Sequence, residues 1–155
     1  LRDDLYPVIW EHRAAIDAVA AARRFVLLLN DRPPAGLGGG YVDAITTDDF
    51  SGGACAAELL KERTGQAGGF AVLGGPSDDN RSLQRVAGFC AHADRTEVIH
   101  AGSWFVEAGR EQAARLLALR PAGIFACNDR LAEAIIRHAR DCGQALPPLV
   151  GFDNA

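Results

Sequence analysis

Short, uninterrupted apolar runs alternate along this chain with longer segments in which apolar residues recur every three or four positions. An uninterrupted run is typical of a strand buried on both faces, whereas the longer spacing is typical of a helix with one buried face. Uninterrupted runs lie at 25–29, 70–73, 123–127 and 149–152, and more mixed runs lie at 41–45 and 97–101. We therefore expect a strand at each run.

The segments with helical spacing lie between these runs, at 16–24, 52–63, 80–93, 106–119 and 129–142. The predicted apolar stripe of the third segment consists of Leu83, Val86, Ala87 and Cys90. Gly143 follows the last segment as a natural helix C-cap. Because strand and helix alternate at least four times, the pattern predicts an α/β fold with a doubly wound parallel sheet. The Pro- and Gly-rich residues 33–40 are predicted to form a flexible connection.

The charge pattern narrows the choice of partners. The chain has 155 residues, a formal net charge of −4 and no cluster of Lys or Arg. Nucleic-acid binding needs a basic surface to neutralise phosphates, so we do not expect this segment to contact DNA itself. No apolar run approaches the roughly 20 residues of a membrane-spanning helix, and the first residues show no secretory signal.

The cysteines and histidines show no metal-binding pattern. The four cysteines, at positions 55, 90, 127 and 142, are widely spaced and form no C-x-x-C motif. The four histidines show no metal-type pairing either. We therefore expect no metal and no cofactor, and we expect four reduced cysteines packed as small hydrophobic residues.

Polar groups follow the predicted strands, where an open parallel sheet binds its ligands. These segments are residues 48–50, 74–77, 102–104, 128–129 and 153–154. They offer carboxylates, amides, hydroxyls and two aromatic rings, which suits a polar, uncharged, ring-shaped ligand such as a sugar. They suit catalysis less well, because no Ser-His-Asp order stands out and GGPS lacks the P-loop pattern. We expect no catalytic residues.

Four stretches of this sequence resemble one family. They are VDAITTDDFSGGACAAELL, FAVLGGPSDDNRSLQRVAGF, PAGIFACNDRLAEAII and LVGFDN, in that order. From about residue 41 to 155 the chain resembles the effector-binding domain of the lactose-repressor/galactose-repressor (LacI/GalR) family, and it is similar to the related periplasmic sugar-binding proteins. The resemblance implies a lobe of the type I periplasmic-binding-protein fold. It departs from the family in GQAGG, where members usually have a G-H-R-type turn.

The resemblance also implies which side chains contact the ligand: Arg85, Asn128, Asp153, Trp104, Asp49 and Phe50. Arg81 lies close to Arg85 along the helix and is a candidate to share its role. Structural explanations stay open beside these roles. Asn128 suits a helix N-cap, Trp104 suits ordinary packing, Asp153 suits a turn, Arg85 suits a solvated surface, and Asp48 and Asp49 suit a helix start.

In the family, a ligand between two lobes changes how they sit against each other, and separate DNA-binding heads respond through a dimer interface. The resemblance implies that 1–47 is the end of the first lobe and that 48–155 is a truncated second lobe, with the DNA-binding domain absent. We thus expect a fragment of a cytoplasmic, homodimeric repressor that senses a small molecule, with no contact to a membrane. Sugars are the family default, and phosphosugars and nucleobases stay open.

Two other functions remain in view. A periplasmic sugar-binding protein of a transporter has the same fold and the same G-F-D ending, and a secretory signal upstream would distinguish it from a regulator with a helix-turn-helix. A doubly wound enzyme is the third hypothesis, although the sequence shows neither a nucleophile–base pair nor a phosphate loop.

Overall fold

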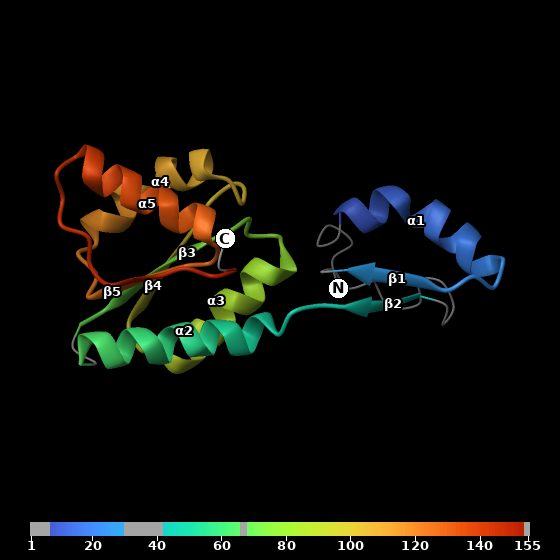
Figure 1. Cartoon of the computed structure of the whole chain (residues 1–155), viewed down its shortest axis with the longest axis horizontal. Helices are drawn as coiled ribbons and strands as arrows, with labels where there is room; N and C mark the ends of the chain where they lie inside the picture. The colour runs from blue at the N-terminus through green and yellow to red at the C-terminus, as the bar shows by residue number, and fades with distance from the viewer. Residues whose placement is uncertain (1–6, 30–41, 66–67, 154–155) are drawn as a thin grey trace. The chain divides into compact units, whose positions relative to one another are not determined.

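The computed structural model describes residues 7–29, 42–65 and 68–153. The chain divides into two compact units, Leu1–Asp48 and Asp49–Ala155 (Figure 1). The connection predicted at 33–40, and Asn154 in the last polar segment, lie outside the described residues.

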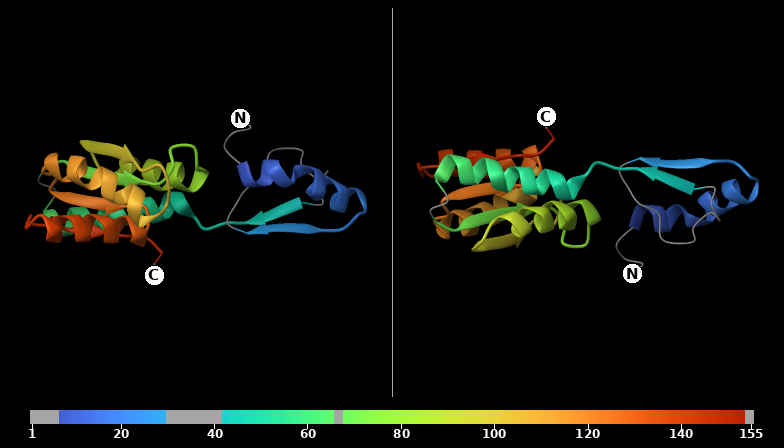
Figure 2. Two further views of the ribbon diagram at one scale, coloured as in Figure 1. Left: turned by 90° about the horizontal axis from the view of Figure 1, so that it is seen from above. Right: turned by 90° about the horizontal axis from the view of Figure 1, so that it is seen from below.

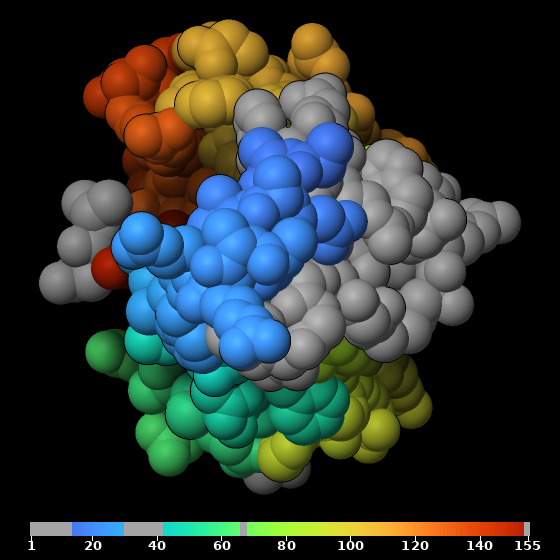
Figure 3. All heavy atoms as spheres, turned by 90° about the vertical axis from the view of Figure 1, so that its right-hand side faces the viewer, coloured from blue at the N-terminus to red at the C-terminus, as the bar shows by residue number. Residues whose placement is uncertain are grey.

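The first unit contains α1 (Pro7–Ala21) and two parallel strands, β1 (Val26–Leu29) and β2 (Val42–Ile45). The helix begins well before the predicted residue 16, with a proline in its first turn, where the missing N–H costs nothing. Burial of β1 alternates along the strand, and Phe25 and Leu29 are 65% and 70% exposed. Burial on both faces was therefore the wrong prediction for 25–29, because in the described residues only one helix accompanies this two-stranded sheet. Figure 3 shows this part of the first unit, in blue, at the surface.

The second unit is built on a parallel sheet with the strand order β4-β3-β5-β6. Its strands are β3 (Phe70–Gly74), β4 (Thr96–His100), β5 (Gly123–Ala126) and β6 (Leu149–Val150). Every residue of β3 and β5 is buried, which confirms the prediction for these two runs. The predicted doubly wound α/β fold of periplasmic-binding-protein type is confirmed.

The helices of this unit cover both faces of the sheet. They are α2 (Asp49–Thr64), α3 (Asn80–His92), α4 (Val106–Ala118) and α5 (Asp129–Asp141). Figure 1 shows α2 and α3 below the sheet and α4 and α5 above it, and Figure 2 gives both faces in turn. Successive residues along a strand point alternately into two hydrophobic cores, one on each face of the sheet. Val72 and Phe125 pack with Phe89 of α3, whereas Leu73 and Ile124 join the cluster on the side of α4 and α5.

No residue of the stripe that the sequence predicts for α3 is fully buried, although Leu83 and Val86 are half-buried. The buried residues of α3 are Ser82, Arg85, Gly88 and Phe89, while Ala87 and Cys90 are exposed. The buried face of α3 is thus displaced by one residue from the apolar stripe. The reason is that Arg85 turns inward to pair with Asp49, and Gly88 lies against the backbone of α2. The cysteine prediction is also wrong in part: Cys127 is buried and in the core, but Cys55, Cys90 and Cys142 are exposed, all four as free thiols.

Two glycines let α2 and α3 cross closely. A Cβ added to Gly53 would collide with the carbonyl oxygen of Arg85, and one added to Gly88 would collide with that of Phe50. The end of α5 confirms the predicted cap, because Gly143 has a φ of +64° and its N–H bonds the carbonyl of Arg140 at 3.2 Å. None of the described helices is long and apolar enough to cross a membrane.

The glycine crossing gives a stability prediction. Alanine normally stabilises a helix by about 1 kcal/mol relative to glycine. For Gly88→Ala we expect the opposite sign, a net loss of roughly 2 kcal/mol in the free energy of unfolding, because the new Cβ meets backbone that cannot rotate away. Urea denaturation measures this. Gly102→Ala is the control, because nothing lies within 4 Å of its added Cβ. A higher urea midpoint for Gly88→Ala would contradict the close crossing.

Candidate functional site

The polar segments at the carboxyl ends of the strands meet where the chain changes direction across the sheet. From β3 the chain passes through α3 to β4 on one side, and it returns through α4 to β5 on the other side of β3. The connections that leave β3 and β5 therefore diverge to opposite faces. This switch point is where open α/β sheets bind ligands.

Arg85 lies at the centre of this edge. Its residue is only 6% exposed, and its guanidinium contacts three other segments. The Nε atom donates to Oδ1 of Asp49 at 2.8 Å, and Nη1 donates to the carbonyl oxygen of Cys127 at 2.5 Å. Nη1 also lies 3.4 Å from Oδ1 of Asp153. The starts of α2 and α5 and the end of β6 are thus gathered around one side chain of α3.

A buried guanidinium is tolerated here because its charge is matched. Asp49 is itself 6% exposed, so the pair loses most of its hydration and depends on direct contact. Two aromatic rings add to this: the Arg85 Cζ atom lies 3.7 Å from the ring centre of Phe152 and 5.5 Å from that of Trp104. Each ring face attracts the cation while shielding it from water.

Trp104 is held by an aspartate that is not among the predicted site residues. Its Nε1–H donates to Oδ2 of Asp79 at 2.8 Å. Asp79 is also the N-cap of α3, where Oδ1 accepts from the N–H of Arg81 at 2.8 Å, and it forms an ion pair with the Arg81 guanidinium at 3.1 Å. Burial raises the pKa of the Asp79 carboxyl, but hydrogen bonds from Arg81 and Trp104 lower it, and the net shift is downward from its ordinary value.

Asn128 is both a helix cap and a link to Trp104. Its Oδ1 accepts from the N–H of Leu131 at 2.8 Å, which caps α5. Its Nδ2 donates to the carbonyl oxygen of Trp104 at 3.1 Å. The cap explanation of Asn128 is therefore correct, and its side chain is in addition fixed at the edge of the sheet.

Ser82 and His100 approach each other near this site, but they do not form a catalytic pair. His100 Nδ1 lies 3.0 Å from the carbonyl oxygen of Gly75 and 3.5 Å from Ser82 Oγ. Because a carbonyl oxygen can only accept, Nδ1 carries the proton and cannot take one from the serine. Ser82 is also fully buried. The pair therefore supports the loop after β3, whose Gly75 lies directly beneath the Trp104 ring.

The structure brings most of the predicted site residues together. Contacts or ring proximity join five of them: Arg85, Asp49, Asp153, Trp104 and Asn128. The explanation of Arg85 as a solvated surface charge is wrong. Phe50 follows Asp49 in α2 and is 40% exposed, and among the described residues its ring makes no hydrogen-bond, stacking or cation–π contact with the other five. Arg81 belongs to the edge through Asp79.

Two participants were missed. Asp79 stands directly before the predicted helix at 80–93, which is the N-cap position, so the capping preference of aspartate was the available signal. Phe152 was assigned to the last strand run, but β6 ends at Val150, and its ring faces Arg85 instead. No local signal in the sequence distinguishes these two positions of a phenylalanine.

Cys127 contributes its backbone and not its thiol. Burial raises the pKa of the Cys127 thiol to about 12, so the thiol stays protonated near neutral pH. Within the described residues, no group of three or more His, Cys, Asp or Glu side chains is arranged to hold a metal ion.

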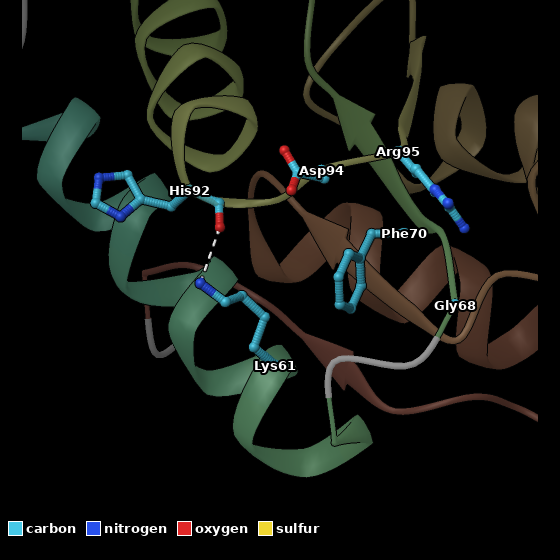
Figure 4. Close-up of a pocket in the computed structure, with 6 residues that line it drawn as sticks. All are labelled: Lys61, Gly68, Phe70, His92, Asp94 and Arg95. Atoms are coloured by element: carbon cyan, nitrogen blue, oxygen red, sulfur yellow. Dashed lines mark hydrogen bonds between the residues drawn. The ribbon is translucent and has the colours of Figure 1, made fainter.

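A separate hollow of about 400 Å³ lies at the opposite edge of the sheet (Figure 4). It is lined by Phe70, at the start of β3, and by Arg95, just before β4, and Lys61 Nζ donates to the carbonyl oxygen of His92 beside it at 3.0 Å. Because it lies at the amino ends of the strands, it is distinct from the cluster around Arg85.

Comparison of the sequence with known protein families finds a match over most of the chain. The family described as "Periplasmic binding protein domain" matches residues 10–155. No curated protein matches the sequence.

Solved structures give the same fold. A LacI family transcriptional regulator from Enterococcus faecalis V583, with bound ribose, is 28% identical with a TM-score of 0.73, over 88% of this chain and 50% of that one. A LacI family regulator from Enterococcus faecium, also with bound ribose, is 24% identical with a TM-score of 0.75, over 91% and 54%. An ABC transporter periplasmic solute binding protein from Actinobacillus succinogenes 130z, with bound D-allose, is 23% identical with a TM-score of 0.78, over 91% and 54%. The chain thus spans about half the length of these proteins.

The ion pair at the centre of the site gives a second prediction. Asp49→Ala should lower the free energy of unfolding by about 3–5 kcal/mol, because it leaves a buried guanidinium with its closest carboxylate removed. Asp141→Ala removes a carboxylate whose pair with Arg110 is about half exposed on both sides, and it should cost no more than about 1 kcal/mol. Urea denaturation compares the two. Equal losses would show that the Arg85–Asp49 contact is not a buried pair.

Asp79 gives a third prediction, measured on the fluorescence of Trp104 in a Trp10→Phe background. Asp79→Ala should change the emission and cost about 1 kcal/mol, because it removes both the indole partner and the cap. Asp79→Ser should restore the cap but not the emission. An unchanged spectrum in Asp79→Ala would contradict the contact.

The lowered pKa of Asp79 also predicts a pH dependence of stability. The Asp79 carboxylate contributes stability above the ordinary aspartate pKa, and this contribution is lost as the pH falls through the lower pKa of the folded state.

Proposed function

This chain belongs to the periplasmic binding protein domain family, and on that premise we propose that it is the effector-sensing domain of a LacI/GalR-type transcriptional repressor, which binds a small sugar-like ligand. The observation that carries this proposal is the buried Arg85 guanidinium, anchored by Asp49 and the Cys127 carbonyl and flanked by two rings at the switch point of the sheet. The family and the neighbours are binding proteins and regulators, not enzymes.

The chemistry of the cluster supports a hydroxylated ligand. A sugar hydroxyl both donates and accepts, so it can bond to a guanidinium N–H and to a carboxylate oxygen. Asp153, 46% exposed on its side chain, is the accessible carboxylate, and Arg85 supplies donors beside it. Trp104 and Phe152 offer flat apolar faces to the C–H side of a sugar ring. Asp49 orients Arg85 and does not need to touch the ligand itself.

In the proposed mechanism the ligand binds between two lobes and shifts their equilibrium. We assign 1–47 to the end of the first lobe and 48–155 to the second. A ligand can move such an equilibrium only by its differential affinity for the two arrangements. Arg85, Asn128 and Asp153 supply that difference if they engage the ligand best when the lobes close. A separate N-terminal domain then reads operator DNA, in a cytoplasmic homodimer.

A periplasmic sugar-binding protein of a transporter is the second candidate. The specific observation in its favour is the D-allose-bound solute binding protein from Actinobacillus succinogenes 130z, whose fold matches with a TM-score of 0.78. The coding sequence upstream of this segment separates the two functions. A helix-turn-helix supports the repressor, and a secretory signal supports the transporter protein.

The binding proposal is tested with Asp153→Gly. Glycine suits this position because Asp153 has a φ of +98°, so the variant removes the carboxylate without straining the backbone. A thermal-shift screen over a sugar panel first identifies a ligand, which raises the melting temperature by mass action. Calorimetry on Asp153→Gly should then show a loss of about 1.5–3 kcal/mol, or roughly 10–150-fold in affinity.

The control for this experiment is Asp141→Ala, which removes a carboxylate from the end of α5 and should leave the affinity unchanged. Arg85→Ala is a poorer test, because it removes the buried guanidinium that pairs with Asp49 and is expected to destabilise the site itself. Wild-type affinity in Asp153→Gly would reject the assignment of Asp153.

A further inference from the structure

The arginines at the carboxyl edge of the sheet are already matched by carboxylates of the protein. Arg85 lies 2.8 Å from Asp49 and 3.4 Å from Asp153, so two carboxylates face one guanidinium. Arg81 is paired with Asp79 at 3.1 Å. These five side chains carry a net charge of −1 (two arginines against three aspartates), before any ligand arrives. An anionic ligand would therefore add negative charge to a cluster that already has an excess of it.

The helix N-termini at this edge are occupied in the same way. A helix N-terminus is a natural site for a phosphate or carboxylate, because its N–H groups and its dipole attract negative charge. Here Asp49 lies in the first turn of α2, the Asp79 carboxylate caps α3, and Asp129 lies in the first turn of α5. Each of these three helix starts thus already has a carboxylate of the protein at its cap or in its first turn, and this negative charge opposes the binding of an anion there.

The remaining groups at this edge do not reverse the balance. The start of α4 has no side-chain cap, but Glu107 lies in its first turn. Arg130 is a third arginine here, and it is exposed, next to Asp129 along the chain and 5.2 Å from the ring centre of Phe105. With Asp129 and Glu107 counted against Arg130, the described residues at this edge keep a net negative charge.

We propose that this site selects neutral polyhydroxylated ligands and rejects their phosphorylated or carboxylated counterparts. This inference rests on the proposed sugar-binding function and decides between the ligand classes that the family resemblance leaves open. Hydroxyls bond to both members of an ion pair without changing its charge balance. A phosphate monoester carries about −1.5 to −2 charges near pH 7 and offers only acceptors when fully ionised, so it is repelled by Asp153 and Asp79.

The contacts of Arg85 explain why its positive charge does not favour an anionic ligand. Its Nε and Nη1 atoms are committed to Asp49, the Cys127 carbonyl and Asp153. Among the described residues, Nη2 is left to donate to a ligand. Two N–H groups on one nitrogen suit one or two hydroxyl oxygens. They do not suit the bidentate fork, spread over two nitrogens, by which arginine grips a phosphate or carboxylate.

The experiment compares each sugar with its own charged derivative on the same protein. Calorimetry measures D-ribose against D-ribose 5-phosphate, D-fructose against D-fructose 6-phosphate, and D-glucose against D-gluconate, with inorganic phosphate alone as a further probe. We expect at least one neutral sugar to bind, with its charged counterpart at least roughly tenfold weaker. The affinity of the neutral sugar should not change when the salt concentration is raised, because no net charge is neutralised.

A charge variant adds a second measurement. Asp153→Asn keeps the shape of the side chain and removes one negative charge, so it should narrow the difference between a sugar and its phosphate ester. Asp141→Asn removes a charge at the far end of α5 and should leave that difference unchanged. Circular dichroism and the unfolding midpoint establish that both variants are folded.

The outcomes separate the two proposals. A phosphate ester or gluconate that binds as tightly as the neutral sugar overturns the selectivity and leaves sugar binding intact. The same difference in Asp153→Asn as in the wild type also overturns it, because the charge would then not be its cause. Failure of every sugar and derivative to bind overturns the proposed function, and the selectivity with it.

Discussion

The close crossing of α2 and α3 is the contact on which the rest of the site depends. Gly53 and Gly88 remove the side chains that would hold the two helices apart, and about one turn before each of them lie Asp49 and Arg85. The crossing therefore brings a carboxylate and a guanidinium to 2.8 Å in a place that water hardly reaches. Neither ion is tolerable there alone, so the packing of the helices and the pairing of the charges enforce each other.

From this pair the connections spread over the whole edge of the sheet. Arg85 reaches the carbonyl of Cys127 after β5 and the carboxylate of Asp153 after β6. Trp104, after β4, is tied to both neighbouring helix starts, by its indole to Asp79 and by its carbonyl to Asn128. Each polar segment is thus held by another before a ligand arrives. A surface assembled in this way loses little conformational entropy on binding, which favours affinity and selectivity together.

Strands and caps were predictable because their signals are local. The runs at 70–73 and 123–127 are buried on both faces as expected, and Asn128 and Gly143 cap α5 where the sequence places them. The inward face of α3 was not predictable from its apolar stripe, because the helix turns Arg85 inward to meet a carboxylate 36 residues away. The exposure of β1 also depends on what covers the sheet, which no run of apolar letters records.

The position of Cys127 makes its reaction with a thiol reagent a measure of local opening at this site. Its main-chain oxygen holds Arg85, while its thiol is buried and has a pKa near 12, so a thiol reagent in solution finds neither access nor thiolate. The rate at which Cys127 is alkylated therefore reports how often the region that holds Arg85 opens locally. The exposed Cys55, Cys90 and Cys142 are accessible without any opening of the structure and supply the baseline. A molecule that stabilises the contacts of Arg85 should slow the alkylation of Cys127 and leave the other three cysteines unaffected. The rate of local opening at this site can therefore be measured without attaching a foreign probe.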